Sequence, residues 1–208
     1  MDYFIEQVRI LEAQLGIRPG FFNELGRETD WGFVIKLHAF IEAALTEAIC
    51  SHAGHPEQLR SVVARLDTAN NQYGKIAFAK ALGIIEKPHR RFISELCALR
   101  NNLAHDVKQA DFSFSEYMGS LTEQERYNFC VSLSLDELFR NDYVDGELQI
   151  ISFVNEVPKF GICMAASILI SDLYASFAKG ELQQQYKIVG QRLVAQTMRA
   201  LEGRNVAL

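Results

Sequence analysis

The feature that most constrains this fold is a long run of apolar residues spaced three or four positions apart. Between residues 30 and 50 the steps are 3, 4, 4 and 3, through Val34, Leu37, Ile41, Leu45 and Ala48. Such steps keep all five side chains on one face of an α-helix but would scatter them over both faces of a strand. The spacing therefore predicts a helix that begins at Thr29 or Asp30 and ends near Cys50. No alternating run elsewhere is long enough to predict a sheet.

Similar spacing, with start and stop residues, predicts helices through most of the remaining chain. They are expected at residues 2–15, 57–66, 73–85, 88–107, 122–132, 158–179 and 181–202. Thr122 and Glu125 have capping-box spacing, and Gly16 and Gly180 are expected to end helices. Residues 108–119 are predicted to form a loop, and residues 148–154 fit a short strand or a short helix. The predicted fold is an all-α helical bundle in a single domain, 1–208.

No segment of the sequence is convincing as a targeting signal or a membrane span. Because the first residues are charged and lack an apolar run, we expect no signal peptide. Residues 160–178 are long enough to span a membrane, but Ser167, Ser171, Asp172 and Ser176 interrupt them. We expect a buried bundle helix there, a cytoplasmic protein and no membrane partner.

The cysteines show no pattern typical of metal binding. Cys50, Cys97, Cys130 and Cys163 are scattered, with no pair at zinc-binding spacing. Each lies in an apolar run, where a thiol behaves as a small hydrophobe, so we expect reduced core cysteines. We predict neither a metal site nor a cofactor. Walker A and GxGxxG patterns do not occur, so nothing indicates a nucleotide hydrolase or a dinucleotide enzyme.

Charge is distributed unevenly along the chain. The net charge of −5 argues against a protein that coats nucleic acid nonspecifically. From Lys87 to Lys108, however, five basic and two acidic residues give a local charge of +3. This stretch suits one phosphate-bearing ligand, and it equally suits a solvated helix face. Arg90, Arg91 and Lys108 are therefore candidate substrate-binding residues or ordinary surface cations.

The motif that points to chemistry lies in the helix expected at 88–107. Its sequence is Arg100-Asn101-Asn102-Leu103-Ala104-His105. Arginine can hold a phosphate, and histidine can transfer protons near neutral pH. On an ideal helix the two side chains are about 140° apart, so His105 points away from the core. Either a distorted turn or a second subunit would have to bring such groups together.

This segment resembles the defining motif of the HEPN superfamily, in which Arg is followed by a polar residue and, after four to six residues, by His. The resemblance implies a bundle of about four core helices, here residues 28–180, with the helices at 2–15 and 181–202 as additions. It also implies a homodimer in which two motifs line one cleft. Some relatives are toxins that an antitoxin protein holds in check.

The resemblance implies a metal-independent endoribonuclease of the toxin or phage-defence kind, with RNA as its partner. A ribose 2′-hydroxyl would attack the adjacent phosphate and leave a 2′,3′-cyclic phosphate. His105 would be the general acid or base, and Arg100 would stabilise the phosphate. Asn101 would orient the histidine or the phosphate.

Structural interpretations of the same residues stay open. Arg100 could pair with an acid on another helix, and His105 could cap the helix C-terminus. His38 and Glu42 lie one turn apart and could pair, which we interpret as a satisfied, partly buried histidine. The chain could then be a non-catalytic interaction or regulatory module, such as a transcription regulator or the partner of a nucleotidyltransferase-like antitoxin.

Overall fold

The structure is a computed structural model that describes residues 2–54, 56–105, 107–135 and 149–205. Within these residues every regular element is a helix, which confirms the all-α prediction. The α-helices and 3-10 helices (η) are α1 Asp2–Gln14, α2 Phe21–Glu24, η1 Leu25–Arg27, α3 Asp30–His52, α4 Pro56–Val63, α5 Lys75–Ala81, α6 Lys87–Ala104, η2 Val107–Asp111, α7 Phe114–Ser120, α8 Glu123–Ser134, α9 Gln149–Glu156 and α10 Pro158–Asn205.

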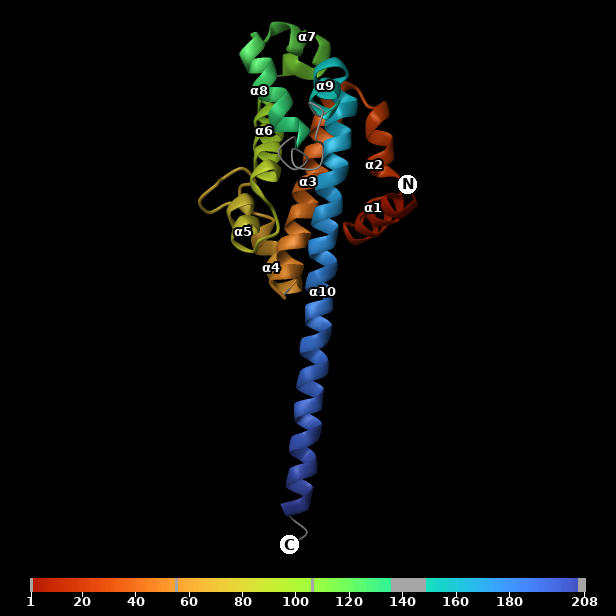
Figure 1. The fold of residues 1–208 in the computed structure, drawn as a ribbon, viewed down its shortest axis with the longest axis vertical. Coiled ribbons are helices and arrows are strands. Elements are labelled where there is room, and N and C mark those ends of the chain that lie inside the picture. The colour runs from red at the N-terminus through yellow and green to blue at the C-terminus, as the bar shows by residue number, and fades with distance from the viewer. Residues whose placement is uncertain (1, 55, 106, 136–148, 206–208) are drawn as a thin grey trace.

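Helix α3 is the centre of the bundle. Thr29 is its N-cap, as predicted, and its side chain accepts a hydrogen bond from the Gly32 N–H at 3.1 Å. The apolar stripe of α3 is fully buried. It packs against α10 on one side and α6 on another, with α1 and α2 flanking α10 (Figure 1). These contacts form one core, to which α1 contributes Val8 and Leu11.

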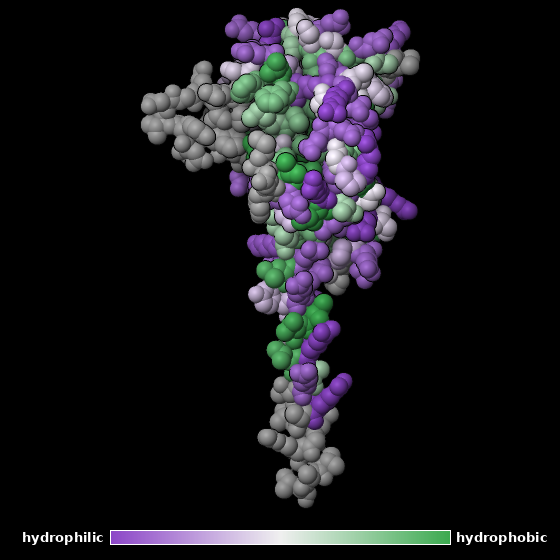
Figure 2. All heavy atoms as spheres, turned by 90° about the vertical axis from the view of Figure 1, so that its right-hand side faces the viewer, coloured by the Kyte–Doolittle hydropathy of each residue, from purple (hydrophilic) through white to green (hydrophobic). Residues whose placement is uncertain are grey.

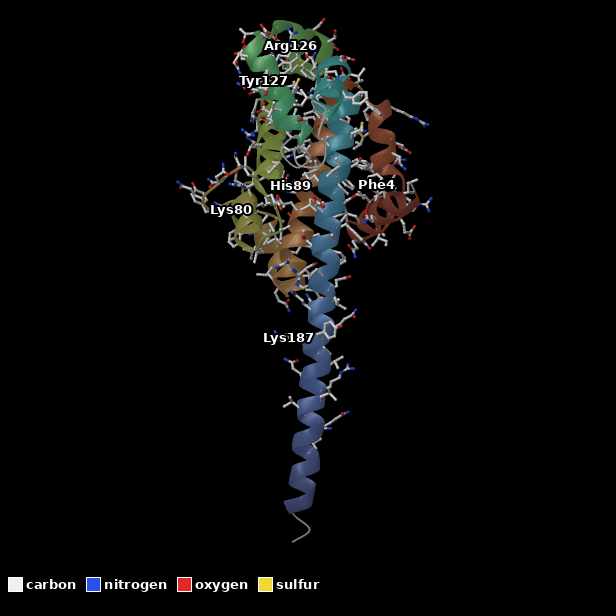
Figure 3. All side chains as sticks on the ribbon, in the orientation of Figure 1. Phe4, Lys80, His89, Arg126, Tyr127 and Lys187 are labelled. Carbon is white, nitrogen blue, oxygen red and sulfur yellow. The ribbon has the colours of Figure 1, made fainter. Side chains whose placement is uncertain are left out.

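Helix α6 is anchored at both ends. At its start, the buried His89 ring accepts a hydrogen bond from the Glu86 N–H at 3.1 Å through Nδ1. Its Nε2 lies 3.0 Å from Asp172 Oδ2 on α10, which ties the two helices together (Figure 3). At the other end, Trp31 Nε1 of α3 donates to the Leu103 carbonyl at 3.2 Å. The motif therefore lies on a fixed helix.

The loop predicted at 108–119 is wrong, because η2 and α7 occupy most of it. Aromatic packing explains the difference. Phe114 is buried against Phe33 of α3, with ring centroids 6.1 Å apart, and Phe112 packs on Phe114 and Tyr117. The Phe114 N–H also donates to Asp30 Oδ2 at 3.0 Å. Tertiary contacts of this kind override weak local patterning.

The choice between strand and helix at 148–154 is settled as helix for the described residues, since α9 covers Gln149–Glu156. The capping box predicted at Thr122 is confirmed at the start of α8, where Thr122 and Glu125 cap one another's backbone. Helix α9 packs against α8 and α10, and Val154 is completely buried.

The predicted stop at Gly180 is also wrong, because α10 continues through it to Asn205. A Cβ atom at Gly180 would lie only 2.7 Å from the backbone carbon and oxygen of Ser51, so glycine permits the close approach of α10 to α3. One glycine costs a helix only about 1 kcal/mol relative to alanine. Gly180 therefore serves packing here instead of ending the helix.

Helix α10 has two parts with different surroundings. Its first part lies against α3, and its second part projects beyond the bundle (Figure 1). By length and composition alone, Pro158–Gln196 is long and apolar enough to cross a membrane, and 44% of its most apolar window is buried inside the protein. The α10 residues that belong to the bundle core lie between Ile162 and Leu173.

Candidate functional site

The motif residues occupy the last turn and the end of α6. Arg100 is half-buried, whereas Asn101 and His105 are exposed. The Arg100 guanidinium donates from Nη1 to Asn101 Oδ1 at 3.0 Å. His105 is the C-cap residue of α6 and has φ −92° and ψ −11°. The alternative interpretation, in which His105 only caps the C-terminus of this helix, requires this position.

Within the described part of the chain, no hydrogen bond or ion pair joins Arg100 to His105. Five helical positions separate the two Cα atoms by roughly 7.5 Å along the axis and turn their side chains about 140° apart. The last turn of α6 is not distorted in a way that overcomes this separation. One chain therefore places the two groups on neighbouring but different faces of the helix end.

Arg100 instead borders a small polar pocket, which we call the Arg100 pocket. Its volume is about 140 Å³, and its walls come from α3, from the segment between α4 and α5, and from α6. The lining residues are His38, Glu42, Asp67, Thr68, Ala69, Cys97, Arg100 and Asn101.

Glu42 is the centre of the hydrogen-bond network under this pocket. Its Oε1 accepts hydrogen bonds from Lys75 Nζ and Thr68 Oγ1, both at 2.6 Å. Burial would raise the pKa of the Glu42 carboxyl, but these two hydrogen bonds, together with the nearby charge of Lys75, hold the pKa below its usual range. The Lys75 side chain is only 1% exposed, so its charge is compensated almost entirely by Glu42.

His38 forms the wall between Glu42 and Cys97. Its Nδ1 lies 3.9 Å from Glu42 Oε2, and its Nε2 lies 3.3 Å from Cys97 Sγ. Burial lowers the pKa of His38, and the positive charges of Arg100 and Lys75 act in the same direction, while Glu42 opposes them. The ring is therefore neutral at pH 7. At 3.9 Å a neutral ring forms neither an ion pair nor a hydrogen bond with Glu42, and its close polar contact is with Cys97, so His38 is a buried histidine that lies beside Glu42.

The charge balance leaves Arg100 as the cation available to a ligand. Lys75 is held by Glu42, His38 is neutral, and burial raises the pKa of the Cys97 thiol to about 12. Among the described residues no carboxylate forms an ion pair with Arg100, which donates a hydrogen bond to the neutral Asn101 amide. A half-buried guanidinium beside an amide can bind one phosphate-like anion, and the Asp67 carboxylate on the same lining is the charge that opposes such binding.

The other predicted cations do not join this pocket. Arg90 is roughly 15 Å from Arg100 along the α6 axis, and Arg91 lies about half a turn round the helix. Lys108 lines a different pocket of about 520 Å³, together with residues of α7 such as Tyr117. One chain therefore does not place these three candidate substrate-binding residues in the Arg100 pocket.

A larger pocket of about 770 Å³ lies where α7, α9 and α10 meet. Its charged residues include Asp30 and Lys159, which pair with each other at 3.2 Å between Oδ1 and Nζ. Asp30 also accepts a hydrogen bond from the Phe114 N–H, so Asp30 and Lys159 both have structural roles. The Arg100 pocket is smaller, but it adjoins the motif.

Comparison with known proteins adds no family to this description, because no model of a protein family, no curated protein and no solved structure gives a significant match. The resemblance of the bundle to the HEPN fold therefore stays a prediction from the motif. The site has to be judged by its own geometry.

Sequence reasoning missed Thr68, Lys75 and Cys97 as members of the site. Thr68 lies in a non-helical segment, and Lys75 follows it at the start of α5. Lys75 precedes the apolar segment Ile76-Ala77-Phe78-Ala79, but Lys80 follows the same segment and is exposed, so this pattern is a weak signal for a buried lysine.

Proposed function

We propose that this protein is a metal-independent endoribonuclease in which Arg100 binds the scissile phosphate at the mouth of the Arg100 pocket. The observation that carries the proposal is a half-buried guanidinium that has no carboxylate partner among the described residues and lies next to a neutral histidine. The motif resemblance supplies the reaction class. The pocket volume equals that of four or five waters at about 30 Å³ each, enough for a phosphoryl group but not a nucleotide.

The proposed reaction uses the ribose 2′-hydroxyl as the nucleophile. The 2′-oxygen forms a bond to phosphorus, the bond from phosphorus to the 5′-oxygen breaks, and the products are a 2′,3′-cyclic phosphate and a 5′-hydroxyl. His105 transfers a proton, Arg100 stabilises negative charge on the phosphorane, and Asn101 holds the guanidinium through its 3.0 Å hydrogen bond. Exposure of His105 at the helix end lets it reach a bound RNA strand.

One chain separates Arg100 from His105, so the proposal includes a second copy that supplies the missing partner across a two-fold axis. An isologous dimer is the commonest oligomer of soluble proteins. Unpaired RNA is the proposed substrate, because in-line attack needs a flexible backbone. The proposal also places the protein in the cytoplasm, with an antitoxin protein as a possible partner.

The test is cleavage of a 5′-labelled mixed-sequence RNA in EDTA. Wild type, Arg100→Ala and His105→Ala are compared with Lys80→Ala, which removes an exposed cation from α5 (Figure 3). We expect cyclic-phosphate ends from wild type and Lys80→Ala, and at least a hundredfold slower cleavage by the other two. Equal cleavage by all four would overturn the proposal. So would no cleavage by folded wild-type protein.

A second candidate is a non-catalytic interaction module, and two observations favour it. His105 occupies a helix C-cap, and α10 presents a long exposed surface beyond the bundle. This candidate requires binding of an RNA oligonucleotide, or of a protein, without turnover. Folded wild-type protein that binds labelled RNA, does not cut it, and loses binding in Arg100→Ala would establish it.

A further inference from the structure

The second part of α10 is the one element that leaves the bundle in Figure 1. We call residues 181–205 the tail; these 25 residues extend about 37 Å at the usual helical rise. Figure 3 shows Lys187 on this part of the helix projecting into solvent, and of residues 181–196 all but Gln184 are exposed. A helix that lacks tertiary packing is only marginally stable in water. We therefore expect the tail to be stabilised by packing against a partner.

The face that α10 turns towards the bundle ends where the tail begins. Leu173, Phe177 and Gly180 on this face are buried. The next residue on the same face is Gln184, whose Nε2 reaches the Ser51 carbonyl at 3.5 Å. One further repeat leads to Gln191, which is exposed. Beyond Gln184 this face carries the exposed Gln191 and Ala195, with the exposed Ile188 at its edge, so none of the three is buried against the bundle.

A different apolar stripe begins at this point, which we call the seam: Leu182, Tyr186, Val189 and Leu193. The steps are 4, 3 and 4 residues, and the four positions fall within an arc of about 60° on the helix. Their exposed fractions are 51%, 70%, 52% and 58%. The seam lies roughly opposite the face that ends at Gly180. Figure 2 shows hydrophobic residues exposed on the tail below the bundle.

The spacing of the seam favours another helix as the partner. Apolar residues that alternate in steps of three and four are the pattern of a coiled coil, in which two helices bury a narrow stripe against each other. A membrane-surface helix has a wider apolar face and a basic polar face. Between residues 181 and 196 the other surfaces of the tail carry five glutamines and two cations beside two isolated exposed apolar residues, Ile188 and Val194, so it is the regular spacing of the seam that favours a helix.

The residues beside the seam fit a second copy of the same helix. Gln183, Gln185, Gly190 and Arg192 flank it; three of these four are neutral and Arg192 alone is charged, so two identical tails would meet little repulsion there. Four side chains from each copy would bury roughly 800 Å² of apolar surface, taking about 100 Å² for each. The glutamine stems bring the total to about 1,000 Å², the lower limit for a specific interface.

We propose that the tails of two copies pair along Leu182, Tyr186, Val189 and Leu193 to form a short coiled coil. This interface is separate from the motif and does not depend on the ribonuclease proposal. Its modest area makes the dimer reversible, with a dissociation constant in the micromolar range expected from an interface of this size.

The test is the mass of the full chain by analytical ultracentrifugation between 1 and 200 µM. Wild type should form dimers as concentration rises. Val189→Glu and Tyr186→Glu should each weaken the dimer by about a hundredfold or more, since each places a charge in the paired stripe of both copies. Gln191→Glu adds the same charge on the opposite face and should leave the dimer intact. The far-UV spectrum checks that the bundle stays folded.

Gly190→Ala supplies a variant that cannot fail by unfolding the bundle. A Cβ at Gly190 would meet no atom within 4 Å, and alanine favours the helix, so it should tighten the dimer severalfold. Wild type that stays monomeric at 200 µM would overturn the proposal. So would a dimer that persists in both glutamate variants, which would place the interface elsewhere. Monomeric wild type that sediments with anionic vesicles would instead assign the seam to a membrane.

Discussion

Replacing Lys75 by Met should cost this protein about 3 kcal/mol of unfolding free energy. Lys75 is 1% exposed, and its Nζ lies 2.6 Å from Glu42 Oε1. Removing one partner of a buried ion pair usually costs about 3–5 kcal/mol, because the other charge stays desolvated. We expect a cost at the lower end of this range, because the Glu42 side chain is 34% exposed and keeps its hydrogen bond from Thr68. Methionine fills nearly the same space, so lost packing adds little.

The pH dependence of this loss identifies its cause. In wild type the pKa of Glu42 is held below its usual 4.5, so the pair stabilises fully above that pH and less as pH falls through the lowered value. In Lys75→Met the remaining burial raises the pKa of Glu42, so the variant gains stability relative to wild type on acidification. The difference between the two proteins should therefore be largest at pH 7 and should shrink towards pH 4.

Equilibrium urea unfolding, followed by far-UV circular dichroism at pH 7, 5.5 and 4.5, measures this difference. The matched control is Lys80→Met, an exposed lysine on the same helix, which should change stability by less than about 0.5 kcal/mol. The double variant Glu42→Gln with Lys75→Met should recover much of the loss, because no charge is left unpaired. A loss below about 1 kcal/mol at pH 7, or one independent of pH, would refute this reasoning.

Three further predictions concern packing, capping and thiol reactivity. Gly180→Ala should destabilise the fold by about 1–2 kcal/mol because its Cβ would meet the α3 backbone, whereas Gly190→Ala should stabilise it by about 0.5–1 kcal/mol, both by thermal unfolding. Thr29→Ala should cost about 1 kcal/mol and Thr29→Ser much less, by the same assay, because the side chain caps α3. Because burial raises the pKa of Cys97 to about 12, iodoacetamide at pH 8 should modify it only in urea, as peptide mass spectrometry would show.

The parts of the fold that were predictable are those set by local chemistry. The start of α3 at Thr29 and the capping box at Thr122 depend on residues three positions apart, so the sequence contains all the information. The positions of α4, α5 and α6 were also predicted to within a few residues at most ends, because each carries its own apolar stripe or proline.

The remaining features depend on contacts between distant residues. Gly180 has the local chemistry of a helix stop, and only the backbone of Ser51, 129 positions earlier in the chain, explains why a glycine continues the helix. The α7 helix depends in the same way on Phe114 meeting Phe33. The site follows this pattern, since Lys75 reaches Glu42, and Glu42 and Arg100 line one pocket, only after α3, α5 and α6 have packed.

The two proposed interfaces lie at opposite ends of the molecule, and this separation makes each proposal testable without the other. Helix α6 ends near α7, whereas α10 leaves the bundle at the other end (Figure 1). Paired tails would therefore not by themselves bring two copies of His105 together, and a shared cleft would need a second contact near the end of α6. Cleavage that survives in monomeric Val189→Glu at low concentration would show that one chain suffices for catalysis. If monomeric Val189→Glu does not cleave RNA, although its Arg100 and His105 are intact, then pairing of the tails raises the local concentration of the motif enough to form the cleft.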